Sequence, residues 1–127
     1  MYRGSEPRGR PEPVTMARQG RSMNKVTVLY TRIDDRQGFE DHFYGSHLPA
    51  AMATPGLVDI RVSKFQADQD GPPPVQIMVE LLFRSEEELK DGMASDVQAA
   101  AVADFGQMLE TYGLEVQFLT GTEDVFS

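Results

Sequence analysis

Hydrophobic and polar positions alternate along four short segments of the chain, and this is the pattern of half-buried β-strands. The expected strands cover residues 25–32, 57–66, 75–83 and 114–122. All four are rich in valine, isoleucine, leucine and aromatic residues. Turn-forming Asp, Pro and Gly residues lie in the connections between them, so the segments are expected to be separate strands.

Two helical segments lie between these strands. The first covers residues 36–52, and its aromatic side chains recur every four positions, at Phe39, Phe43 and His47. That spacing predicts a helix with one buried stripe. The second begins at Ser85, an N-cap residue followed by three glutamates, breaks near Ala94 and continues to Gly113, a typical C-cap residue.

The predicted order is therefore β-α-β-β-α-β, the order of the ferredoxin-like α+β fold. In that fold the strands form one four-stranded antiparallel sheet, and both helices cover the same face of it. The other face is left without a helix layer. The side chains on that uncovered face therefore bear directly on function.

Strand alternation divides the side chains between the two faces. The aliphatic set is expected under the helices: Val58, Ile60, Val62, Ile77, Val79, Leu81, Val116 and Phe118. The opposite set is mixed: Leu29, Arg61, Met78, Glu80, Leu82, Gln117 and Leu119. Two such mixed faces, packed together in a homodimer, would close a barrel around a pocket for a small molecule. The alternative is an ordinary hydrated sheet face with scattered leucines.

Charge separates the start of the chain from the rest. Residues 1–24 hold five arginines and two glutamates, a net +3, and the remainder holds 7 basic and 18 acidic residues, a net −11, which together give −8. We expect residues 1–22 to be a disordered basic tail rich in Pro and Gly, and residues 23–127 to be one domain. An acidic domain repels phosphate backbones, so nucleic acid is not an expected partner.

Other classes are made improbable by what the sequence lacks. The 127 residues include no cysteine, so disulfides, thiolate metal sites and a cysteine nucleophile are excluded. Apolar runs stay well below the roughly 18 residues that span a bilayer. No glycine-rich nucleotide-binding motif occurs. The sequence thus predicts a cytoplasmic protein with no cofactor, no metal and no membrane partner.

Several short motifs resemble the EthD family of the dimeric α/β-barrel superfamily. They are Phe39-x4-Tyr44-x2-His47-x-Pro49 with Pro55-Gly56-Leu57, then Val79-Glu80-Leu81-Leu82-Phe83-x-Ser85, then Asp104 and Val116-Gln117-Phe118. The resemblance covers about residues 25–125 and implies a homodimeric barrel with one pocket per subunit. The family name refers to ethyl tert-butyl ether degradation. Wider relatives include lactone isomerases, polyketide-tailoring enzymes and cofactor-free monooxygenases. The chain has no tryptophan, unlike the monooxygenases that rely on one.

His47 is the leading candidate for chemistry, because a histidine exchanges protons near neutral pH. The alternative is a packing role on the aromatic helix face. Arg61 and Glu80 are the other predicted catalytic residues, as an anion-binding group and a base, unless they form a structural salt bridge. The predicted substrate-binding residues are Tyr44, Met78, Leu29 and Gln117. His42 lies about 140° from His47 on an ideal helix and is expected at the surface, with no shared metal.

Together these features predict a cofactor-independent isomerase, dehydratase or oxygenase-type enzyme acting on a small, oxygenated, apolar compound. Two alternatives stay open. One is a non-catalytic barrel that binds a small molecule or assists a degradation pathway, and the other is an assembly module.

Overall fold

The computed structural model describes residues 21–126 and has the predicted order of elements. They are β2 (Arg21–Ile33), α1 (Arg36–His42), the π-helical turn η2 (Phe43–His47), α2 (Leu48–Ala51), β3 (Leu57–Lys64), β4 (Ile77–Phe83), α3 (Glu86–Met93), α4 (Asp96–Tyr112) and β5 (Leu114–Val125). The four strands form one sheet in the order β3-β4-β2-β5, and every neighbouring pair is antiparallel. The predicted ferredoxin-like α+β fold is confirmed.

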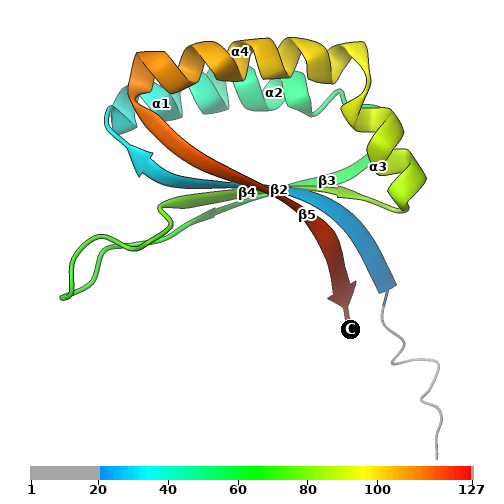
Figure 1. Cartoon of the computed structure of the whole chain (residues 1–127), viewed down its shortest axis with the longest axis horizontal. Coiled ribbons are helices and arrows are strands. Elements are labelled where there is room, and N and C mark those ends of the chain that lie inside the picture. The colour runs from blue at the N-terminus through cyan, green and yellow to red at the C-terminus, as the bar shows by residue number, and fades with distance from the viewer. Residues whose placement is uncertain (1–20, 127) are drawn as a thin grey trace, which may run out of the picture.

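The helices lie in one layer over one face of the sheet (Figure 1). The opposite face, which we call the open face, carries no helix. Strands β2 and β5 pair along almost their whole length and curve away from the helix layer beyond the ends of their neighbours. Within residues 21–126, no helix is long and apolar enough to cross a membrane.

The start of the domain differs slightly from the predicted one. Arg21 pairs with Val125 and Ser22 pairs with Asp124, so both residues belong to the sheet although the sequence assigned them to the tail. The remainder of the predicted tail, residues 1–20, lies outside the described residues. Pairing with β2 also carries β5 three residues beyond its predicted end.

Elements α1, η2 and α2 follow one another without a break and together make up the first helix. The core forms where the aromatic stripe of this helix meets the helix side of the sheet. Phe39 and Phe43 are 0% and 2% exposed, and their rings stack with centroids 5.4 Å apart. Tyr30 of β2 packs against Phe39 at 5.0 Å between ring centroids. Each buried aromatic ring contributes about 1.5–3 kcal/mol relative to exposure, so this stripe anchors the helix to the sheet.

One residue of the predicted helix-side set, Val58, is wrong because β3 contains a β-bulge. Leu57 pairs with Phe83 while Asp59 pairs with Leu82, which leaves Val58 as the extra residue on β3. Leu57 takes the place in the core that alternation assigned to Val58. A bulge adds one residue to a strand and shifts the alternation before it, which simple counting along the sequence cannot register.

Gly92 marks the closest approach of α3 to the rest of the fold. A Cβ atom at Gly92 would lie 2.6 Å from the Pro55 carbonyl oxygen and 2.8 Å from a ring carbon of Phe83. Only glycine fits here without displacing α3. Gly106 of α4 is the matched case, since a Cβ atom there meets nothing within 4 Å.

We expect Gly92→Ala to lower the free energy of unfolding by about 1–3 kcal/mol, because overpacking forces backbone shifts. Gly106→Ala should raise it by up to about 1 kcal/mol, because alanine favours the helix. Urea denaturation of both variants tests this. Equal effects of the two substitutions would show that the approach of α3 to Pro55 is not tight in solution.

Candidate functional site

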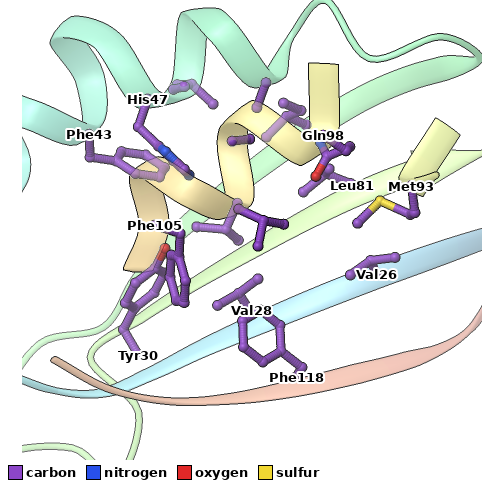
Figure 2. A pocket seen from close by; sticks show the side chains of 16 residues that line it. Val26, Val28, Tyr30, Phe43, His47, Leu81, Met93, Gln98, Phe105 and Phe118 are labelled. Atoms are coloured by element: carbon purple, nitrogen blue, oxygen red, sulfur yellow. The ribbon is translucent and has the colours of Figure 1, made fainter. Parts of the chain in front are cut away.

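An apolar cavity of about 130 Å³ lies between the helix layer and the sheet (Figure 2). Its floor comes from the helix-side residues of β2, β3 and β4, and its roof from the first helix and α4. Two lining residues, Val102 of α4 and Phe118 of β5, are 61% and 59% exposed. The cavity therefore opens to solvent between α4 and the edge strand β5.

Small side chains explain why the helix layer leaves this space. Ala51 of α2 and Ala101 of α4 are both buried and both line the cavity. A methyl group at each of these positions cannot reach the sheet across the gap that a leucine would fill. The cavity is thus built into the helix–sheet contact rather than into the open face.

His47 lies in the wall of the cavity at the end of η2, beside Phe43 and Phe105 (Figure 2). Its Nδ1 atom lies 2.8 Å from Oδ2 of Asp104 on α4. An ionised carboxylate only accepts hydrogen bonds, so Nδ1 carries the proton and Nε2 of the neutral ring has a free lone pair. The arrangement fixes both the orientation and the tautomer of His47.

His42 shares the same carboxylate, contrary to the surface position expected from the sequence. Its Nε2 atom lies 2.9 Å from Oδ1 of Asp104, and its Nδ1 atom lies 2.8 Å from the Tyr112 hydroxyl. With both histidines neutral, Asp104 accepts one hydrogen bond from each, and Tyr112 donates to His42. Within this set, Nε2 of His47 is then the ring nitrogen left without a partner among the described residues.

The π-helical turn brings the two histidines together. Residues five apart lie about 140° apart on an α-helix, whereas a π-helix bonds residue i to residue i+5 and places them nearly above one another. Phe43–His47 form this wider turn, so His42 and His47 reach one carboxylate. The prediction failed because it assumed a regular α-helix.

Asp104 is held in its ionised form. Burial alone would raise the pKa of this carboxyl group, but hydrogen bonds from His47 and His42 outweigh burial, and the pKa lies below its usual value. A permanent negative charge next to His47 stabilises the imidazolium form that appears when the ring takes up a proton.

Arg61 and Glu80 do not line this cavity beside His47, and their expected catalytic roles in a pocket between two sheets stay predictions. They are cross-strand neighbours on the open face, on the other side of the sheet. Glu80 accepts a hydrogen bond of 2.6 Å from Lys25, and Arg61 forms an ion pair with Glu123. Neither is near enough to orient His47, because the alternation of β3 and β4 points them away from the helices.

The predicted substrate-binding residues also lie outside the cavity. Leu29 pairs with both Met78 and Gln117 across the sheet, so these three side chains form one patch of the open face. Tyr44 is 41% exposed, and its ring packs against Phe43 and lies 5.4 Å from Nζ of Lys64. The grouping on the open face was foreseen, but the cavity is on the opposite face.

Asp104 is the residue that reasoning from single positions missed as part of the site. The sequence motifs singled it out without giving it a role. Its signal was weak, because an aspartate in the middle of an amphipathic helix usually faces solvent. Gln98, another lining residue, is 4% exposed. It is followed in the sequence by three alanines, which predict no polar contact.

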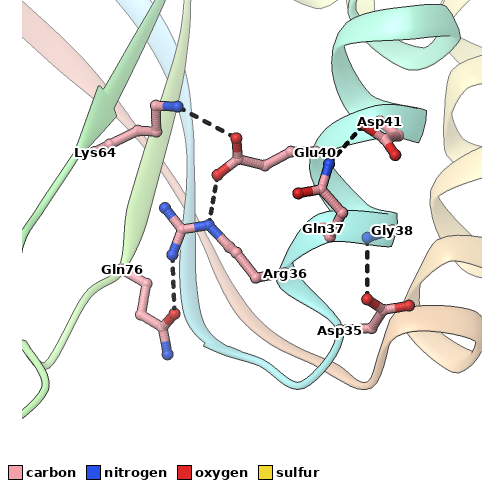
Figure 3. A network of polar contacts seen from close by, with 8 residues as sticks. All are labelled: Asp35, Arg36, Gln37, Gly38, Glu40, Asp41, Lys64 and Gln76. Carbon is pink, nitrogen blue, oxygen red and sulfur yellow. Dashed lines mark hydrogen bonds and ion pairs between the residues drawn. The ribbon is translucent and has the colours of Figure 1, made fainter.

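A second polar network braces the first helix at its N-terminal end (Figure 3). Arg36 binds Glu40 at 2.6 Å, and Lys64 of β3 reaches the same carboxylate at 3.3 Å. The Arg36 and Lys64 contacts outweigh burial and lower the pKa of Glu40, with the Arg36 hydrogen bond as the largest cause. This network lies at the surface and ties α1 to the sheet. Across residues 21–126, no group of three or more His, Asp or Glu side chains is arranged to hold a metal ion.

Comparisons with known proteins support the resemblance seen in the sequence. The structure matches that of an EthD family protein from Bacillus halodurans with a TM-score of 0.69. The two sequences are 27% identical, and the match covers 80% of this chain and 98% of that one. The chain thus has the ferredoxin-like fold of that family, and its predicted resemblance to EthD proteins is confirmed.

Two further comparisons extend this result. An uncharacterised 11.0 kDa protein from the thcB-thcC intergenic region of Rhodococcus erythropolis is 27% identical over 82 residues, which are 65% of this chain and 80% of that protein. A cofactor-independent oxygenase from Streptomyces nogalater shares the fold with a TM-score of 0.54 and 10% identity, over 80% of this chain and 92% of that one. No family model matches the chain.

The hydrogen bonds to Asp104 predict a pH-dependent contribution to stability. Because its pKa is lowered in the folded protein, the contribution is present above the unfolded value of about 3.9 and is lost as the pH falls through the folded value. Asp104→Asn should cost about 1 kcal/mol at pH 5, allowing for solvent screening of this partly exposed carboxylate, and less at pH 2.5, where a larger share of the carboxyl group is protonated.

Urea denaturation at the two pH values measures this difference. Asp91→Asn, at an exposed aspartate of α3, is the control and should cost little at either pH. A cost of Asp104→Asn that is the same at pH 5 and at pH 2.5 would contradict the charged hydrogen bonds.

Proposed function

We propose that this protein is a cofactor-independent enzyme that moves a proton on a small, oxygenated, apolar molecule, with His47 as the acid–base group. One observation carries the proposal: His47 stands in the wall of an apolar cavity with Nδ1 bound to Asp104 at 2.8 Å. A histidine that served only packing would not need a carboxylate to fix its tautomer. Relatedness in fold to a cofactor-independent oxygenase agrees with chemistry that needs only side chains.

The proposed step is the transfer of a proton from carbon. Nε2 of His47 removes a hydrogen from the carbon next to a carbonyl group, and the C–H electron pair moves into the carbonyl to give an enolate. The imidazolium form of His47 is stabilised by Asp104. His47 then returns the same proton to a different atom of the enolate system, which isomerises the substrate and restores the neutral ring. The proton and the electron pair both balance.

The apolar lining favours this step. Water-filled sites weaken electrostatic interactions, whereas a cavity from which water is displaced by the substrate strengthens the attraction between the imidazolium and Asp104. An arrangement in which the cavity merely stored a ligand would gain nothing from a histidine whose free nitrogen is basic. For that reason we favour catalysis over storage.

Deuterium exchange tests the proposal without knowledge of the natural substrate. In D2O, the protein should accelerate the exchange of the α-hydrogens of cyclohexanone and of small lactones, as followed by NMR. His47→Gln should reduce this acceleration at least about 100-fold, because general acid–base catalysis contributes about 10²–10⁴.

His42→Gln is the matched control for this experiment. It removes the other histidine bound to Asp104 but no residue of the cavity, so exchange should fall less than about tenfold. Equal exchange in the wild-type protein and in His47→Gln would exclude His47 as the base and favour the storage function.

We also propose that two copies pair through their open faces to form the dimeric barrel. Leu119 of β5 is 53% exposed on this face, and it lies opposite the buried Thr27 of β2. The neighbouring charges of Lys25 and Arg61 are already neutralised by carboxylates of the same chain. Pairing would therefore bury apolar surface without leaving these charges unpartnered.

Leu119→Lys should convert the dimer to a monomer in light scattering at micromolar concentration, because it buries an unpaired charge in the interface. Met52→Lys is the control, since Met52 is 63% exposed at the end of the first helix and outside the open face. It should leave the mass unchanged. A wild-type protein that is monomeric under these conditions would overturn the pairing.

A further inference from the structure

Two buried polar groups in the cavity have capacity for hydrogen bonds that the protein does not use. They are the hydroxyl of Tyr30, a residue 2% exposed, and the side-chain carbonyl of Gln98, a residue 4% exposed. Buried polar groups are almost always hydrogen-bonded, so two free groups facing one cavity indicate a ligand with matching groups.

Gln98 is fixed in one orientation by its neighbours. Thr54 donates its hydroxyl proton to the Ala51 carbonyl oxygen at 2.7 Å, so the Thr54 oxygen can only accept from Gln98. The contact of 2.8 Å between Gln98 and Thr54 must therefore come from the amide nitrogen of Gln98. The amide oxygen is left facing the cavity, as Figure 2 shows, and it can only accept.

Tyr30 is the complementary donor at the other end. Within residues 21–126 its hydroxyl has no hydrogen-bond partner, and burial raises the pKa of this phenol above its usual range. The hydroxyl therefore stays protonated at physiological pH. Its ring and the ring of His47 both pack against Phe105, at 6.2 Å and 6.3 Å between centroids, so donor and base share one end of the cavity.

The volume limits what fits between these two ends. A cavity of about 130 Å³ is close to the roughly 150 Å³ of an engineered cavity that holds benzene. A polycyclic substrate cannot be enclosed as a whole without rearrangement of the lining. One six-membered ring with short substituents fills the space.

We propose that the cavity selects a single-ring ketone that has a hydroxyl or amine on the far side of the ring. The ketone oxygen accepts from Tyr30, which places the neighbouring carbon beside His47, and the distal group donates to Gln98. This inference names the substrate class of the site and rests on the proposed function for the chemistry, but not for the binding.

A pair of ketones of equal size tests the selection. Binding of 4-hydroxycyclohexanone and of 4-methylcyclohexanone is measured by calorimetry with the full chain. The ratio of the two affinities should fall about tenfold or more in Gln98→Met, because the hydroxyl then loses its acceptor. Tyr30→Phe should weaken both ketones by a similar factor and leave the ratio unchanged.

Two further readouts keep the outcomes distinct. The first is binding of the methyl ketone to Gln98→Met, which shows whether this variant retains the cavity. The second is the NMR signal of the Gln98 side-chain amide in the wild-type protein, which should shift on addition of the hydroxy ketone but not of the methyl ketone. An unchanged ratio, an amide that responds equally to both ketones, or a wild-type protein that binds neither would overturn the selection. A ratio that falls as expected, without any deuterium exchange, would instead overturn catalysis by His47.

Discussion

The carboxylate of Asp104 is the contact on which the helix layer and the site both depend. It joins α4 to the first helix through His42 and His47, at distances of 2.9 Å and 2.8 Å. The same two helices also meet through aromatic rings, with Tyr112 5.6 Å from His42 and Phe105 6.3 Å from His47 between ring centroids. One polar group therefore both spaces the helices and orients the residue that lines the cavity between them.

The π-helical turn at Phe43–His47 is what makes this contact possible. A regular helix would direct His42 and His47 to different sides, and Asp104 could bind one of them but not both. The wider turn keeps Phe43 in the core, where it is 2% exposed, while it carries His47 to the cavity. Irregular helical turns are frequent at functional sites for this reason: they redirect a side chain without breaking the helix.

The sequence predicted the fold far better than the site. Alternation and helical period are local signals, so the strands, the stripe of Phe39 and Phe43 and the division of the two sheet faces could be read directly. The contact of His47 with Asp104 spans 57 positions and depends on the π-turn, neither of which has a local signature. The sequence pattern did not predict this cavity, because the cavity results from the small size of Ala51 and Ala101. It predicted a pocket on the mixed open face instead.

The two faces of the sheet thus have separate tasks. On the open face, Arg61 of β3 reaches Glu123 of β5, although these strands lie at opposite edges of the sheet. Such a contact requires the sheet to curl, and beneath it Glu80 and Leu82 are only 6% and 1% exposed. On the helix side, the cavity opens beside the exposed Phe118 of β5. The charged contact thus belongs to the open face, whereas the apolar lining and the basic nitrogen of His47 meet on the helix side of the sheet.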